Sequence, residues 1–83
     1  VVYLSVNISD SDFDTYNKVS ELLSQYLSHI DIRKFSFEDK ILDMVVLAPA
    51  LSIEETTQLT SDLVALYPSS NLTILDTSDL PQV

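Results

Sequence analysis

The chain contains no cysteine and no glycine, and each absence excludes a class of chemistry. Without cysteine there can be no disulfide, no thiolate metal site and no cysteine nucleophile. Average usage of about 7% would give roughly six glycines in a chain of this length. Loops that cradle phosphates and dinucleotide-binding fingerprints need glycine for tight turns and close backbone approach, so the sequence excludes both motifs.

Basic residues are scarce, and the formal net charge of the 83 residues is −9. All four basic residues, Lys18, Arg33, Lys34 and Lys40, lie in the first half, and none follows Ala48. Because nucleic-acid binding requires a basic footprint that neutralises phosphates, we expect no nucleic-acid partner. The electrostatically suited partners are cations or basic patches on another protein.

Long apolar runs are also absent. The run Met44–Ala50 contains Pro49 and falls far short of the roughly 20 residues that a membrane-spanning helix requires. The start has neither the basic segment nor the cleavage pattern of a signal peptide, so we expect a cytoplasmic location without direct membrane insertion. The chain begins Val-Val, without an initiator Met, which we interpret as a domain cut from a longer protein.

Two hydrophobic periods alternate along the chain, as expected for a mixed fold. A period of two predicts strands, and steps of three and four predict helices. The predicted strands are Val1–Ile8, Ile30–Phe37, Ile41–Leu47 and Asn71–Leu75, and the predicted helices are Phe13–Ser28 and Ser52–Tyr67. This βαββαβ order predicts an α+β, ferredoxin-like sandwich in residues 1–76: a four-stranded antiparallel sheet (order 4-1-3-2) with two helices on one face. Residues 77–83 are expected to be a tail or linker.

Local signals mark the boundaries of these elements. Ser11 is the expected N-cap of the first helix, and Ser52 with Glu55 forms a capping box for the second. The alternation of the second strand slips at Arg33 and Lys34, which predicts a bulge there or a strand that begins only after Ile32.

The stretch SDSDFDTYNKVSE, residues 9–21, places four carboxylates at positions 1, 3, 5 and 12 of a calcium-loop template. Position 6, which needs glycine in such a loop, is Thr15. We favour a helix start, because acidic residues in a first turn interact well with the helix dipole. The alternative is a divalent-cation site made of Asp10, Asp12 and Asp14.

No arrangement of residues indicates catalysis, so we expect a protein that is not an enzyme and has no cofactor. The single histidine, His29, is expected to cap the end of the first helix. Phe35 and Phe37 are expected to pack in the core rather than stack on bases, because their surroundings hold few basic residues.

The third predicted strand, Ile41–Leu47, is apolar on both faces. A strand of this kind indicates that the sheet face away from the helices is covered as well. We therefore expect a homodimer in which that face, or an exposed edge strand, packs against a second copy. The predicted dimer surface consists of Tyr3, Arg33, Leu42, Met44 and Val46. The opposite set of the third strand, Ile41, Val45 and Leu47, is equally apolar and stays open as the alternative. Arg33 with Lys34 could instead protect an edge of the sheet.

The βαββαβ order, the length and the lack of a catalytic arrangement resemble an ACT-like regulatory domain over nearly the whole chain. The cytosolic C-terminal domain of MgtC/SapB-type membrane proteins is similar. The stretch from Asp12 to Asp76 also resembles the cytosolic domain of cation diffusion facilitators, where a hairpin precedes a helix that starts L-S-x-E-E, as Leu51, Ser52, Glu54 and Glu55 do here. These resemblances imply a non-catalytic regulatory or dimerisation domain of a larger, membrane-transport-related protein. The alternative is a small-ligand or divalent-cation sensor whose site is the acidic loop after the first strand, Ile8–Asp14.

Overall fold

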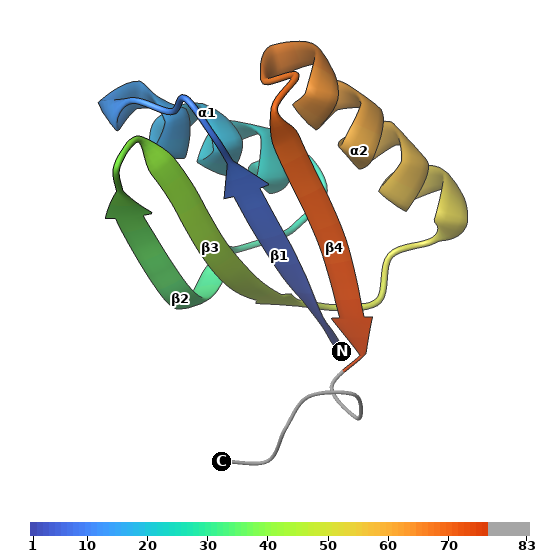
Figure 1. Cartoon of the computed structure of the whole chain (residues 1–83). Coiled ribbons are helices and arrows are strands. Elements are labelled where there is room, and N and C mark those ends of the chain that lie inside the picture. The colour runs from blue at the N-terminus through green and yellow to red at the C-terminus, as the bar shows by residue number, and fades with distance from the viewer. Residues whose placement is uncertain (77–83) are drawn as a thin grey trace.

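The computed structural model describes residues 1–76, which form an α+β fold (Figure 1). The elements follow one another as β1 (Val2–Ile8), α1 (Phe13–Ser24), β2 (Asp31–Glu38), β3 (Ile41–Ala48), α2 (Ile53–Leu66) and β4 (Ser70–Asp76). The predicted βαββαβ topology is therefore confirmed. The expected tail at 77–83 lies outside the described residues.

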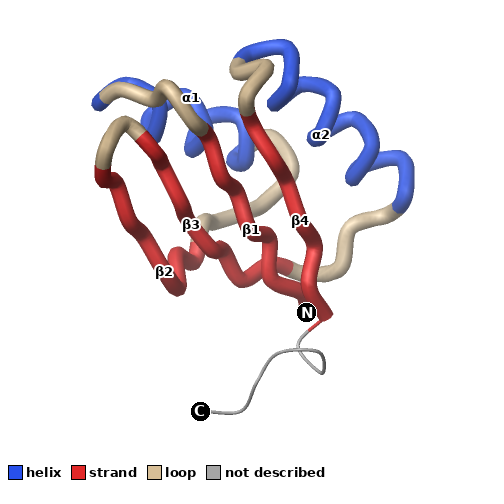
Figure 2. Tube along the Cα trace, in the orientation of Figure 1, coloured by secondary structure: helices blue, strands red, loops and turns tan. Residues whose placement is uncertain are grey.

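All neighbouring strands are antiparallel, and their order across the sheet is β2-β3-β1-β4. Counted from the β4 side, the same neighbours run 4-1-3-2. Both helices lie on one side of this sheet and leave its other face without helical cover (Figures 1 and 2). In residues 1–76, no helix is both long enough and apolar enough to cross a membrane.

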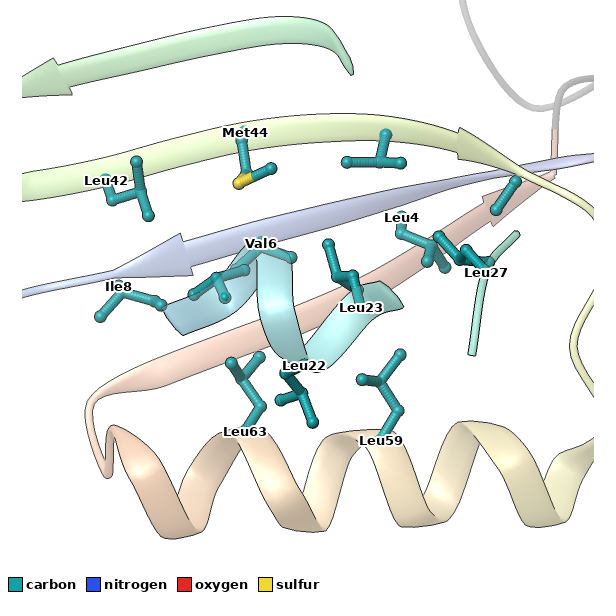
Figure 3. Packing of buried hydrophobic residues seen from close by; sticks show 13 residues of the cluster. Leu4, Val6, Ile8, Leu22, Leu23, Leu27, Leu42, Met44, Leu59 and Leu63 are labelled. Carbon is teal, nitrogen blue, oxygen red and sulfur yellow. The ribbon is translucent and has the colours of Figure 1, made fainter. Parts of the chain in front are cut away.

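The core lies between the sheet and the two helices (Figure 3). The alternation of β1 turns Leu4, Val6 and Ile8 toward the helices, and all three are fully buried. Each pairs directly with a residue of β3, and directly paired residues of antiparallel strands share one face. The partners are Val46 for Leu4, Met44 for Val6 and Leu42 for Ile8. From the helices, the buried core residues are Val19, Leu22, Leu23, Leu59 and Leu63.

The N-cap of α1 is Asp12, so the prediction of Ser11 was wrong by one residue. The Asp12 carboxylate accepts hydrogen bonds from the backbone N–H groups of Asp14 (2.9 Å) and Thr15 (3.1 Å). In return the Thr15 hydroxyl accepts one from the Asp12 backbone N–H at 2.9 Å. This reciprocal arrangement satisfies donors that a helix start otherwise leaves unpaired.

The other boundaries follow the predictions to different extents. The helix α1 ends at Ser24 rather than Ser28, because the N–H groups of Gln25 and Tyr26 bond three residues back and tighten the last turn. The capping box of Ser52 and Glu55 at α2 is confirmed. The bulge in β2 is also confirmed, as a register shift between Ile32 and Lys34.

Candidate functional site

The helix-free face of the sheet changes from apolar to polar along the strands. Its side chains form rows of directly paired residues across β3, β1 and β4. The first row is Leu47, Tyr3 and Leu75; the second is Val45, Ser5 and Thr73; the third is Asp43, Asn7 and Asn71. The apolar side chains of these rows therefore gather at the end of the sheet where β1 starts and β3 and β4 end. Ile41, which pairs with Glu38 and is 42% exposed, is a separate apolar residue at the other end of β3.

Apolar residues at this end of the face are half-buried by their neighbours within the sheet. They are Tyr3, Val45, Leu47 and Leu75, which we call the apolar end. On β2, Asp31 pairs with Leu47, and Lys34 pairs with Val45. Charged side chains thus border the apolar end on the β2 side, whereas on the β4 side it reaches the edge of the sheet at Leu75.

Three of the five predicted dimer-surface residues were assigned to the wrong face. Leu42, Met44 and Val46 each have 0% of their surface exposed and pack under the helices (Figure 3). Both alternating sets of β3 are apolar, so the strand itself does not indicate which set faces inward. The register with β1 shows which set faces inward. Leu4, Val6 and Ile8 face the helices, and their directly paired partners on β3 lie on the same face.

The other two predicted residues lie far apart. Tyr3 is on the helix-free face, in the centre of the apolar row. Arg33 lies at the bulge of β2, the strand at one edge of the sheet, and forms an ion pair with Asp31 at 2.9 Å. Val45 and Leu47 belong to the opposite set of β3, which the sequence left open as the alternative surface. Leu75 is the residue that sequence reasoning missed, and its direct pairing with Tyr3 is the signal that would have found it.

The acidic loop between β1 and α1 does not assemble the suggested cation site. In residues 1–76 no group of three or more His, Asp or Glu side chains is arranged to hold a metal ion, and this includes Asp10, Asp12 and Asp14. Oδ1 of Asp12 is already bonded to the start of the helix. Asp10 has a positive φ of 53° at the turn out of β1.

Ser11 gives this loop a structural role. Its buried hydroxyl lies 3.1 Å from the carbonyl oxygen of Ile8 and 2.9 Å from that of Lys40, and its backbone N–H also donates to Lys40. Lys40 and Asp39 form the β2–β3 turn with positive φ at both residues, a conformation that normally favours glycine or asparagine. Ser11 therefore connects the start of α1 to the β2–β3 turn by hydrogen bonds. In this chain without glycine, Asp39 and Lys40 adopt the positive φ values of that turn.

The two edges of the sheet differ in protection. At the β2 edge the strand is interrupted by its bulge and carries Arg33 and Lys34, and Lys34 lies 3.7 Å from Asp43. At the β4 edge the strand is regular over seven residues, and among the described residues no strand lies on its outer side. The edge strand β4 has no bulge in its register with β1 and no charged residue between Ser70 and Leu75.

An aromatic cluster joins α1 to β2. The rings of Phe13 and Phe37 stack with centroids 5.7 Å apart, and those of Tyr16 and Phe35 meet edge-on at 5.3 Å. Phe13 is 89% exposed and Phe35 50% exposed, so the expectation that Phe35 is a core residue was wrong. Phe37 is half-buried and packs against the core, as predicted.

A polar contact joins the two helices. The Tyr26 hydroxyl donates to Oδ2 of Asp62 at 2.8 Å, and the amide of Gln58 donates to Oδ1 at 2.8 Å. Desolvation, followed by the hydrogen bond to Asp62 and the negative charges of Asp62 and Glu55, raises the pKa of Tyr26. Two of the carboxylates of α2 are therefore near the end of α1.

Residues 1–76 contain no pocket that could enclose a small molecule. In comparisons with known proteins, the chain matches no family model, no curated protein and no solved structure.

Proposed function

We propose that this domain is a non-catalytic regulatory module that couples two copies of a longer chain by homodimerisation through its sheet. The observation that carries the proposal is the row Leu47, Tyr3 and Leu75 on the side of the sheet that no helix covers. Apolar area removed from water stabilises a contact by about 25 cal/mol per Å², so side chains placed in this way favour association.

The position of the start of β1 and the end of β4 supports the coupling role. The two strands are antiparallel neighbours, so these ends lie side by side (Figure 1). Val2 pairs with Asp76, one residue from the pair Tyr3 and Leu75. Chain that precedes β1 and chain that follows β4 would therefore leave the sheet at the same place. Contact between two sheets near this place would therefore bring the attached segments of both copies together.

The charge of the chain predicts how such a dimer responds to salt. Two copies that each carry a formal charge of −9 repel one another, and salt screens that repulsion. A contact made by apolar side chains and neutral backbone groups should therefore become tighter as salt is added. A contact built on ion pairs should become weaker.

Sedimentation velocity of the 83-residue chain over a wide concentration range tests the proposal. We expect the molar mass to rise from the monomer value of 9.3 kDa toward that of a dimer, and the rise to begin at lower concentration in higher salt. A chain that stays monomeric at every concentration and salt level would contradict dimerisation. A dimer that dissociates on adding salt would contradict the apolar contact.

A further inference from the structure

We infer that the second copy binds along the outer edge of β4, by antiparallel pairing of the two β4 strands. This inference rests on the proposed dimerisation. It places the contact at the β4 edge, where the apolar row ends at Leu75, rather than over Leu47 and Tyr3. The first reason is the backbone: an edge strand presents a row of unpaired N–H and C=O groups, and these groups suit the addition of another strand. In the described part of the chain, nothing pairs with β4 on that side.

The second reason is the lack of edge protection. Proteins usually block exposed edges with lysine, proline, bulges or very short strands. The strand β4 has none of these over Ser70–Asp76, whereas β2 has a bulge, Arg33 and Lys34. The same sheet therefore protects one edge and leaves the other open.

The third reason concerns charge and identifies the occupant as a second copy. No residue from Leu63 to Leu75 is charged, although 20% of the whole chain is. Two of the three carboxylates of α2, Glu55 and Asp62, lie near Tyr26 beside the end of α1. Two strongly acidic molecules can approach most closely where neither presents charge, and β4 provides such a surface.

The fourth reason is that β4 is complementary to itself. An antiparallel pairing centred on Thr73 would place Thr73 opposite Thr73 of the second copy, and threonine pairs are favourable cross-strand neighbours. On the helix side it would place Leu72 opposite Ile74, which is 37% exposed in the single chain. On the helix-free side, Leu75 from each copy would gain cover from the added strand. The two sheets would become one continuous sheet.

A matched pair of lysine variants tests the inference by sedimentation velocity. Thr73→Lys places like charges opposite each other at the centre of the proposed contact, and it should raise the dimer dissociation constant by at least about tenfold. Ser36→Lys makes the same charge change on the helix-free side of β2, and it should leave the dissociation constant unchanged. Because Thr73 is exposed, we expect the lysine variant to keep its fold. Circular dichroism of the variant checks this.

The outcomes separate this inference from the proposed function. If Leu47→Thr dissociates the dimer and Thr73→Lys does not, the copies meet on the helix-free face: dimerisation stands and the edge contact is overturned. Equal weakening by Thr73→Lys and Ser36→Lys also overturns the edge contact. A wild-type chain that never dimerises overturns both.

Disulfide formation gives a second measurement, because the chain has no cysteine of its own. The Cα atoms of opposed residues in antiparallel strands are about 4.5–5.5 Å apart, within the roughly 4.4–6.8 Å that a disulfide spans. Thr73→Cys chains should therefore become linked to one another faster than Ser36→Cys chains under the same oxidant. Equal rates would overturn the inference.

Discussion

The two edge strands of this sheet differ in whether they block pairing with a strand of another molecule. The edge strand β2 is bulged and charged, and its aromatic side chains contact α1. The edge strand β4 is regular and uncharged from Ser70 to Leu75. Both strands belong to one small sheet, and only β2 carries the features that block pairing with another strand. This difference is the basis of the proposed contact at β4.

The ion pairs at the β2 edge are informative because they contribute little to stability. The side chains of Arg33 and Lys34 are 51% and 65% exposed, and exposed pairs of this kind typically contribute about 0–1 kcal/mol. Their position on an edge therefore explains them better than their contribution to the fold. Charge there discourages a strand from another molecule.

The largest expected effect is on stability, and it compares the packing of α2 under β4 with the aromatic cluster of α1 and β2. Leu63 of α2 is 2% exposed, so Leu63→Ala should lower the free energy of unfolding by about 2–5 kcal/mol. Phe13→Ala should change it by less than about 0.5 kcal/mol, because that ring is mostly in water despite its stacking on Phe37. Urea unfolding measures both. A comparable loss in the two variants would mean that the aromatic cluster of α1 and β2 is a structural unit rather than a surface feature.

The second effect is the removal of protection from β2. In the double variant Arg33→Thr/Lys34→Thr, the edge keeps its bulge but loses its cations, and we expect a several-fold rise in self-association. Light scattering against concentration measures it, and the double variant Thr57→Ser/Ser61→Thr on exposed positions of α2 serves as a control. If self-association is unchanged, the bulge alone protects this edge and the cations have another role.

Much of the fold follows from patterns that each element carries by itself. Alternation in β1, the capping box of Ser52 and Glu55, and the parity slip at Arg33 are local signals, and each corresponds to a feature of the structure. The helical period is a weaker guide at the first residue of each helix. Phe13 and Ile53 both fit that period, yet they are 89% and 83% exposed.

The candidate contact surface was harder to predict because it depends on pairing between distant strands. In β3, both alternating sets are apolar, and only the register with β1 assigns Met44 to the core and Val45 to the helix-free face. The open edge of β4 depends on which strands are neighbours, although its lack of charge is visible in the sequence from Leu63 to Leu75. Local patterns therefore predict elements, whereas the surfaces left free depend on how those elements meet.

The smallest effect concerns the hydrogen bond between Tyr26, which follows α1, and Asp62 of α2. Desolvation and then Asp62 raise the pKa of Tyr26 above its ordinary value of 10.0 in the folded chain. Above pH 10.0 the unfolded chain loses this proton before the folded chain does, so the stability contributed by Tyr26 is complete below that pH and is lost as pH rises through the folded-state pKa. Urea unfolding from about pH 8 to about pH 11 should show a steeper alkaline loss in the wild type than in Tyr26→Phe. Asp62→Asn, which removes the carboxylate charge, should give an intermediate slope. Identical slopes in all three chains would show that folding does not raise the pKa of Tyr26.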